Sequence, residues 1–453
     1  MRLPSRPLDD HKEAKLDHNL KSFHFDVTND ELSWNDVPLM KLVQQHGTPL
    51  KITYLPQISS HVQHAKSLFE KAMRRRGYPG RHNYCYPTKT SHFRYILEEV
   101  LKNDTHIEIS STFDVPIIRE LYRTRKIDKD TYIICNGHKQ PLYTQHITKL
   151  VEEGFNVIPV LDSVRELEAY DDVLSQPFSI GIRIATRSSR LGVQTSDICN
   201  FYRTRIQTHN KFKLKMLHMH TNITDTPQYW TQLSSFINTY CTLHKINPHL
   251  DSINIGGGMP IAHSLDFAFD YEAVIDRIVE TITRICADNA VPPPHLFTEF
   301  GSYTVAESSA TIYQVIAQKQ QSEEELWYVI NGSFITQIPD TWGKKELFIC
   351  LPINNWNHSG RDVLLGGLTC DSQDVYGDVK MPEFDEAGEE QYMGFFHTGA
   401  YQEELSGYGG VSHCLVPAMK HVVVDRDWEG KWTSRVAADE QGSESMMQLL
   451  GYA

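Results

Sequence analysis

The sequence predicts an α/β protein, in which a (β/α)8 barrel is accompanied by a second domain made mainly of β-strands. Up to about residue 305, short apolar runs alternate with amphipathic stretches, which is typical of parallel strands joined by helices. Beyond that point, strand-like runs follow one another, separated by Pro, Gly and Asn clusters. The length of 453 residues is sufficient for two such domains.

Eight short apolar runs are candidates for the barrel strands. In order, they are Tyr84–Tyr86, His106–Ser110, Tyr132–Asn136, Asn156–Asp162, Ser179–Ile184, Leu214–His220, Ser252–Gly258 and His295–Gly301. Stretches such as Ile58–Arg76, with apolar residues at helical spacing, lie between them. Eight units over roughly 250 residues match the length of a (β/α)8 barrel. Periodicity alone leaves an open doubly wound sheet as the alternative.

The runs after residue 305 predict an antiparallel β domain, a sandwich or a barrel. They are Thr311–Ala317, Glu325–Ile330, Glu346–Leu351, Val363–Leu365, Tyr392–Phe396 and His421–Val424. We therefore expect an N-terminal segment, 1–45, that joins the β domain, a barrel over 46–305 and a C-terminal β domain over 306–453. The acidic stretch Asp371–Gln391 contains Gly and Pro, so we expect a surface loop there.

The composition excludes several classes of protein. Hydrophobic residues make up 40% and charged residues 22%, as in folded globular chains. The net charge of -13 argues against nucleic acid as a partner, because phosphate contacts need a basic surface. No apolar run approaches the ~20 residues that span a bilayer, and the polar N-terminus lacks the apolar core of a signal peptide. We expect a cytoplasmic protein without a membrane partner.

None of the eight cysteines forms a Cys-x-x-Cys pair, so free thiols are expected rather than a zinc site.

Distinctive polar residues fall at the ends of the predicted strands. In a (β/α)8 barrel, the chemistry takes place at the C-terminal ends of the strands, so these residues should meet on one rim. They are Lys89, Asn136, Arg183, His220, the trio Gly256, Gly257 and Gly258, and Glu299. Lys89 directly follows a short apolar strand, and partial burial there would favour a nucleophilic amine. The ordinary alternative is a solvated surface lysine.

Three further motifs have a chemical and a structural interpretation. Three consecutive glycines after a strand allow backbone N–H groups to surround a phosphate, or form a flexible turn. Glu299 could keep the ring nitrogen of a heteroaromatic cofactor protonated, or could cap a helix. His218 and His220 share one strand face. They could bind a metal, although no third ligand is suggested nearby, or one imidazole could stack on a flat cofactor; core histidines are the alternative.

The segment Gly-Gly-Leu-Thr-Cys-Asp-Ser-Gln-Asp combines a thiol with carboxylates. Cys370 could donate a proton to a carbanion, while Asp371 and Asp374 could hold a cationic substrate. A buried cysteine followed by an acidic turn is the alternative.

In this order, the motifs resemble the fold type III pyridoxal-phosphate decarboxylases, the group of the ornithine, diaminopimelate and arginine decarboxylases. The resemblance extends over roughly residues 25–425. The closer likeness is to short arginine decarboxylases of the Bacteroidetes type, and it is carried by the stretches PLKITYLPQIS, GGLTCDSQD, GFFHTGAYQE and SHCLVPAMKHVVVDRD. The resemblance implies an alanine-racemase-like barrel, pyridoxal 5'-phosphate as cofactor, no metal, and an obligate homodimer with active sites shared across the interface.

The resemblance also implies a role for each motif residue. Lys89 corresponds to the Schiff-base lysine, His220 to the imidazole that stacks on the cofactor, and Glu299 to the partner of the pyridine nitrogen. The remaining cofactor positions are Glu108, where the family usually has Asp, Arg183 of the fifth strand, Gly256, Gly257 and Gly258 at the phosphate, and Tyr401, which touches the phosphate. Asp340 matches an acid that binds the distal amine of the substrate, and Cys370 and Asp371 match residues that enter the site from the partner subunit.

Two departures from the family pattern bear on the cofactor and the substrate. Ser302 stands where the family's Glu-Pro-Gly-Arg has arginine, and Thr221-Asn222-Ile223 replaces the usual Gly-Ser after the stacking histidine. The second departure leaves the register between His218 and His220 open. Phosphate binding then depends more on the glycines, Tyr401 and Asn222. The missing arginine also disfavours diaminopimelate, whose second carboxylate needs a cation.

The function implied by the resemblance is decarboxylation of a basic amino acid. The acids Asp340, Asp371 and Asp374 favour a cationic side chain, and a planar guanidinium pairs two-pronged with a carboxylate. We therefore expect conversion of L-arginine to agmatine and carbon dioxide, in polyamine biosynthesis, with ornithine or lysine as alternative substrates. A diaminopimelate decarboxylase, an amino-acid racemase and an inactive partner-binding homologue are the further alternatives. Retention of Lys89, Cys370 and Glu299 argues against the inactive homologue.

Overall fold

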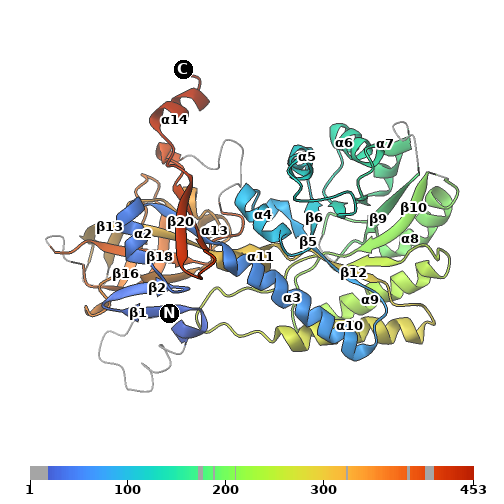
Figure 1. The fold of residues 1–453 in the computed structure, drawn as a ribbon, viewed down its shortest axis with the longest axis horizontal. Helices are drawn as coiled ribbons and strands as arrows, with labels where there is room; N and C mark the ends of the chain where they lie inside the picture. The colour runs from blue at the N-terminus through green and yellow to red at the C-terminus, as the bar shows by residue number, and fades with distance from the viewer. Residues whose placement is uncertain are drawn as a thin grey trace. The chain divides into compact units, whose positions relative to one another are not determined.

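The computed structural model describes residues 19–171, 177–186, 189–209, 211–322, 325–384, 388–402 and 413–452. Residues 1–18 of the expected N-terminal segment therefore lie outside the described residues. The chain forms two compact units (Figure 1). The barrel unit comprises Ile58–Pro260 and Phe269–Thr304, and the β unit comprises Met1–Gln57, Ile261–Ala268 and Val305–Ala453.

Eight parallel strands close into a barrel in the order β10-β11-β12-β5-β6-β7-β8-β9. Their bounds are β5 His82–Pro87, β6 His106–Ile109, β7 Ile133–Cys135, β8 Val157–Leu161, β9 Phe178–Arg183, β10 Phe212–His218, β11 Ser252–Asn254 and β12 His295–Thr298. The predicted (β/α)8 barrel is thus confirmed, and the closed strand order excludes the open doubly wound sheet. A buried cluster that includes Cys85, Ile134, Ile158, Met216 and Phe297 brings side chains of five strands together.

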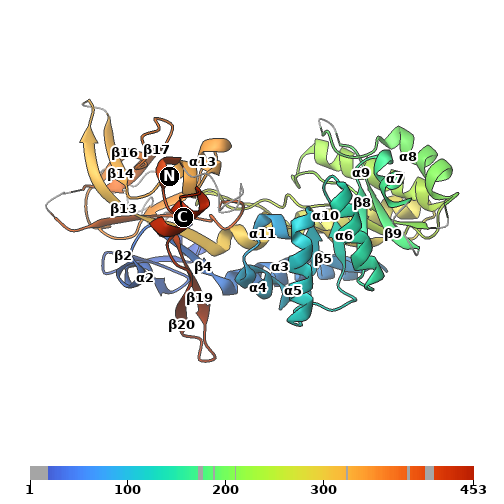
Figure 2. The same ribbon diagram turned by 90° about the horizontal axis from the view of Figure 1, so that it is seen from above.

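Helices lie around these strands (Figure 2). Their bounds are α3 Leu55–Arg76, α4 Arg94–Leu101, α5 Val115–Arg123, α6 Pro141–Glu152, α7 Glu168–Asp171, α8 Thr195–Phe201, α9 Pro227–His244, α10 Tyr271–Asp288 and α11 Gly301–Val305. Local sequence explains where they begin. Thr226 and Asp270 cap α9 and α10 by accepting backbone N–H groups of the first turn, and Pro227 occupies the first turn of α9, where its missing N–H costs nothing.

The β unit contains a sheet of nine strands and a separate three-stranded sheet, β1-β2-β3. The large sheet runs β17-β16-β14-β13-β4-β19-β20, and β18 pairs with both β13 and β15. The bounds are β1 Phe25–Thr28, β2 Glu31–Trp34, β3 Val37–Pro38, β4 Leu50–Tyr54, β13 Ser309–Gln320, β14 Leu326–Ile330, β15 Ile349–Pro352, β16 Gly360–Gly366, β17 Val375–Pro382, β18 Gln391–Phe396, β19 Lys420–Arg426 and β20 Trp432–Ala438. Its helices are α2 Leu39–His46, α12 Phe334–Gln337, α13 Asp340–Gly343 and α14 Ser443–Leu449.

Two details of the β unit differ from the sequence-based expectations. The unit extends to residue 57 rather than 45, because β4 pairs with β13 and β19. The loop expected over Asp371–Gln391 is wrong in part, since it contains β17. Tyr376, Val379 and Met381 bury their side chains in the core, and this burial outweighs the acidic character of the segment.

The sheet is mostly antiparallel, as expected, but β14 with β16 and β4 with β19 form parallel pairs.

Among the described residues, the structure contains no helix with the length and apolar character needed to cross a membrane.

Candidate active site

The motif residues of the barrel unit gather at the C-terminal ends of the strands. Lys89 lies in the short turn after β5, and its Nζ forms an ion pair with Oε2 of Glu108 on β6. Ser110 donates a hydrogen bond to the other carboxylate oxygen of Glu108, at 2.8 Å. Glu108 is fully buried, whereas Lys89 is 38% exposed. The amine is therefore accessible to a ligand, and a buried carboxylate beside it holds it in place.

Glu299 follows β12 and is held by two amide side chains from other strands. Asn136, at the end of β7, donates to Oε1 at 3.0 Å and to Oε2 at 3.1 Å. Asn254, the last residue of β11, donates to Oε1 at 2.7 Å. Burial alone would raise the pKa of Glu299, but the interactions with His218 and with the ammonium group of Lys89 outweigh it and hold this pKa well below its usual range. The carboxylate is thus ionised although it is almost completely buried.

Sequence reasoning named Asn136 only as a strand-end residue and missed Asn254. The available signal was a polar side chain inside the buried strand Ser252–Asn254, because a buried amide requires hydrogen-bond partners. Asn254 satisfies that requirement twice, since its Oδ1 also accepts the backbone N–H of Gly256 at 2.8 Å.

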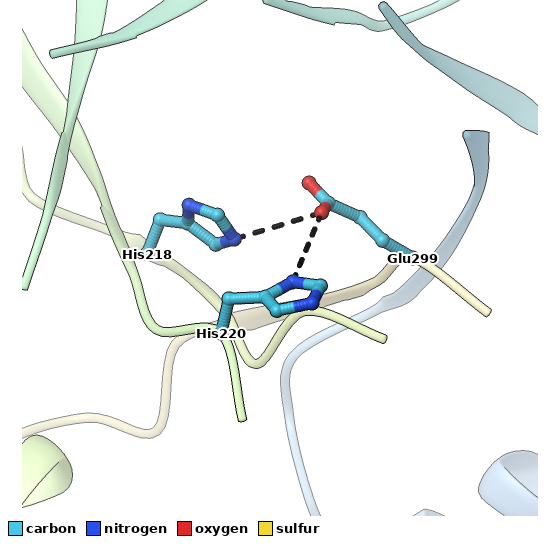
Figure 3. A group of neighbouring side chains, drawn as sticks. All are labelled: His218, His220 and Glu299. Carbon is cyan, nitrogen blue, oxygen red and sulfur yellow. Dashed lines mark ion pairs between the residues drawn. The ribbon is translucent and has the colours of Figure 1, made fainter. Parts of the chain in front are cut away.

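Two histidines face the same carboxylate (Figure 3). Nε2 of His218 lies 3.6 Å from Oε2 of Glu299, and Nδ1 of His220 lies 4.0 Å from that oxygen. The His218 side chain is completely buried, whereas that of His220 is 38% exposed. Burial lowers the pKa of His220 to about 4, so its imidazole is neutral at neutral pH. Only His220 offers an accessible ring face, which favours it over His218 for the predicted stacking role.

The expectation that no third metal ligand lies near the histidine pair is wrong. Ligand atoms of His218, His220 and Glu299 lie within 4.8 Å of one another. Both oxygens of Glu299, however, already accept amide hydrogens from Asn136 or Asn254. An ionised carboxylate organised in this way is also suited to one further hydrogen-bond donor, such as a protonated ring nitrogen.

The glycine loop that follows β11 is in close contact with the site. Gly256 and Gly258 have φ of 73° and 76°, a region that favours glycine. A Cβ atom added to Gly257 would lie 2.3 Å from the carbonyl oxygen of Glu299, and one added to Gly258 would lie 2.8 Å from Oδ1 of Asn222. Within the described part of the chain, no acceptor binds the N–H groups of Gly257 and Gly258, so both can bind an anion.

We expect Gly257→Ala to lower the free energy of unfolding by about 1–3 kcal/mol, the usual cost of overpacking, and to weaken pyridoxal-phosphate binding. The added methyl group meets backbone rather than a movable side chain, so the loop must shift. Thermal melting and titration with the cofactor measure both effects. Gly377→Ala is the matched control, because an added Cβ there meets no atom within 4 Å. A Gly257→Ala variant with the melting temperature and cofactor affinity of the wild type would contradict the interpretation that this position requires glycine.

We expect Asn254→Ala to cost about 1–3 kcal/mol in the free energy of unfolding, because the buried N–H of Gly256 loses its acceptor. The pKa of Glu299 should also rise, since the ionised carboxylate loses a donor. Urea denaturation of the cofactor-free protein measures the stability change. Asn238→Ala, an exposed change on α9, should leave stability nearly unchanged. Equal stability of the two variants would show that the hydrogen bonds of Asn254 to Gly256 and Glu299 do not stabilise the fold.

Arg183 ends β9, at the same end of the barrel. Burial lowers its pKa from the ordinary value, and the carboxylate of Asp162 opposes that effect. Its proposed contact with the cofactor stays a prediction.

The remaining predicted residues lie in the β unit. Asp340, which begins α13, accepts hydrogen bonds at Oδ2 from Lys344 and from Gln402, each at 2.9 Å. Asp374 is buried and accepts the backbone N–H of Phe334 at 2.7 Å and the hydroxyl of Thr369 at 2.7 Å. Both carboxylates therefore have partners within their own chain, and their assignment to substrate binding stays a prediction.

Cys370, Asp371 and Tyr401 are more accessible. Cys370 is exposed, and Asp371 is partly exposed. Tyr401 has a φ of 65°, and the ammonium group of Lys344 lies 5.3 Å from its ring centre. Their roles at the phosphate and in a partner's site likewise stay predictions.

The fold and the site define a pyridoxal-phosphate enzyme on a (β/α)8 barrel. Residues 57–306, which make up more than half of the chain, match the family described as pyridoxal-dependent decarboxylases, pyridoxal binding domain. The chain belongs to this family, so the resemblance seen in the sequence is confirmed, and the protein is an amino-acid decarboxylase with pyridoxal 5'-phosphate as its cofactor.

Similar proteins include several arginine decarboxylases. Arginine decarboxylase 2 of Arabidopsis thaliana is 21% identical over 518 aligned positions, which cover 85% of this chain and 73% of the relative. The biosynthetic arginine decarboxylase of Bacteroides thetaiotaomicron is 22% identical over 315 positions, with 63% and 48% covered.

Solved structures share the fold. The biosynthetic arginine decarboxylase of Campylobacter jejuni superposes with a TM-score of 0.85 at 18% identity, covering 96% of this chain and 91% of that one. Diaminopimelate decarboxylase of M. jannaschii, in complex with L-lysine, gives 0.81 at 15% identity, covering 93% and 96%.

Proposed function

We propose that the protein converts L-arginine to agmatine and carbon dioxide, a reaction that supplies polyamine synthesis. The observation that carries the proposal is the buried, ionised carboxylate of Glu299, held by Asn136 and Asn254 on the same rim as the accessible amine of Lys89. The choice of arginine is supported by the relatives that are named arginine decarboxylases. Ornithine and lysine are the alternative substrates.

The residues on the rim fit pyridoxal 5'-phosphate. Lys89 would bind its aldehyde carbon, Glu299 its ring nitrogen, and the free N–H groups of Gly257 and Gly258, with Arg183, its phosphate. When bound, the cofactor supplies an electron sink for the charge left by the departing carboxylate.

The side chains around the cofactor position each have a distinct task. Glu108 pairs with the amine of Lys89 and holds it at the rim, beside the position of the cofactor aldehyde. Glu299 remains charged and keeps a proton on the ring nitrogen, while Asn136 and Asn254 prevent it from turning away. His220 is neutral and presents a flat ring without an added positive charge.

The substrate side of the site involves the β unit in this proposal. Cys370 donates the proton that replaces the carboxylate, and Asp371 binds the guanidinium, with Asp340 as a second acid. Cys370 and Asp371 act in the site of a partner subunit, so a homodimer is part of the proposal, as is a cytoplasmic location. Ser302 supplies no cation for a second carboxylate, which disfavours diaminopimelate.

The test is an assay of the purified holoenzyme with arginine, ornithine, lysine and diaminopimelate, one at a time. Carbon dioxide release and mass spectrometry of the product identify the reaction. Agmatine is the expected product, and the Lys89→Ala variant serves as the inactive control. Formation of another amine, with no agmatine, would overturn the choice of arginine. Formation of a D-amino acid without carbon dioxide would identify a racemase instead.

A further inference from the structure

Two cysteines that are distant in the sequence lie side by side on the surface of the β unit. Sγ of Cys370 is 3.3 Å from Sγ of Cys414, and the backbone N–H of Cys370 also points to the Cys414 sulfur, at 3.5 Å. These two are the exposed members of the eight cysteines, and the other six are buried or partly buried. The pair is therefore close, and within the single chain both thiols are exposed.

Neighbouring groups can activate the thiol of Cys414. Nδ1 of His413 lies 3.1 Å from Sγ of Cys414, and Nε2 of the same ring lies 3.5 Å from a carboxylate oxygen of Asp371. An imidazole in this position can take the thiol proton, and a carboxylate on its far side stabilises the imidazolium. The contact with Cys414 raises the pKa of Cys370, and the imidazole of His413 lies beside Cys414, so Cys414 is the thiol whose proton has an adjacent base.

The backbone fixes this arrangement. Cys414 and Leu415 both have a φ of 52°, in the left-handed region that non-glycine residues rarely adopt. Such a conformation is retained where the surrounding structure imposes it. The surrounding structure therefore holds Cys414 in an unusual backbone conformation, and in this conformation its sulfur lies beside that of Cys370.

We propose that Cys370 and Cys414 are a redox modification site, in which a small disulfide such as oxidised glutathione converts the two thiols into a reversible disulfide. His413 takes the proton of Cys414, and the thiolate attacks one glutathione sulfur. The first glutathione leaves as a thiol with that proton. Cys370 then attacks Sγ of Cys414, and the second glutathione leaves with the proton of Cys370. Two protein thiols are oxidised to one disulfide, and one glutathione disulfide is reduced to two thiols.

The consequence for activity rests on the proposed function, in which Cys370 donates a proton to the product carbon. A sulfur bound in a disulfide has no proton to donate, so oxidation turns the enzyme off and reduction restores it. The formation of the disulfide depends only on the geometry of the pair. Cys241 and Cys286 provide the contrast, because their sulfurs lie 3.9 Å apart but both side chains are fully buried.

The test equilibrates the holoenzyme in glutathione buffers from fully reduced to fully oxidised. Peptide mapping after thiol blocking should find Cys370 linked to Cys414, with Cys241 and Cys286 still reduced. Decarboxylase activity should fall by about 10²-fold or more, the range for loss of a proton donor, and should return with dithiothreitol. Cys414→Ser should keep basal activity and lose the response, whereas Cys286→Ser should respond as the wild type does.

Two outcomes would overturn the inference. The first is a Cys370–Cys414 pair that stays reduced in fully oxidised glutathione. The second is a disulfide that forms without any loss of activity. Failure of the proposed function gives a different result, because a protein that decarboxylates no basic amino acid can still be mapped for the disulfide.

Discussion

Replacing Lys89 with alanine should lower kcat by roughly 10³-fold or more, within the range for loss of a group that takes part in the chemistry. Lys89 supplies the amine beside Glu108 at the open end of the barrel, and alanine provides no nucleophile. Carbon dioxide release from arginine measures the loss. Borohydride reduction of the holoenzyme, followed by peptide mapping, should place the cofactor on the peptide that contains Lys89.

The controls separate chemistry from folding. Lys102→Ala removes an exposed lysine that pairs with Glu99 at the end of α4, and it should leave kcat unchanged. Because Lys89→Ala leaves the buried Glu108 without a cation, the double variant Lys89→Ala/Glu108→Gln removes that uncompensated charge. It should fold as the wild type does and remain inactive. Cofactor trapped on another lysine, such as Lys139, would refute the assignment.

Glu299→Gln should lower kcat by about 10²–10³-fold, or roughly 2.7–4 kcal/mol, as for other preorganised electrostatic groups. Glutamine retains the shape of the side chain but not the charge. One of its two terminal atoms is an NH2 group, so an amide hydrogen of Asn136 or Asn254 loses its acceptor. Steady-state kinetics gives kcat, and titration of the cofactor-free protein gives the affinity for pyridoxal phosphate.

Glu280→Gln is the matched control for Glu299→Gln, since Glu280 is an exposed partner of Arg76 on α10. Its kinetics should equal those of the wild type. A Glu299→Gln enzyme with kcat within a few-fold of the wild type would show that the charge of Glu299 is not required.

The barrel and the rim could be predicted because each chemical group lies near the end of an apolar run or just after it. Lys89, Arg183, His220 and Glu299 carry that signal in the sequence, and the parallel strands bring their ends together. The support around Glu299 could not be predicted in the same way. Which amides reach one carboxylate depends on the order and register of the closed strands, and Asn254 looks like any other strand residue in the sequence.

Long-range contacts in the β unit could not be predicted from the sequence for a related reason. Cys370 and Cys414 are 44 residues apart, and only the folded sheet and its loops bring their sulfurs together. The acidic composition around Asp378 suggested a loop, whereas the buried side chains of Tyr376, Val379 and Met381 form a strand. In both places tertiary packing outweighs the local composition.

The amide support of Glu299 constrains how this barrel can change during evolution or redesign. Asn136 and Asn254 come from strands on different sides of β12, and both amides end at one carboxylate. A mutation of Glu299 to an apolar residue therefore leaves two buried amides without an acceptor. Its effect on the free energy of unfolding is not additive with the effects of mutations at either asparagine. A variant with a different charge at this position therefore avoids that loss of stability only if Asn136 and Asn254 are replaced by compatible residues as well.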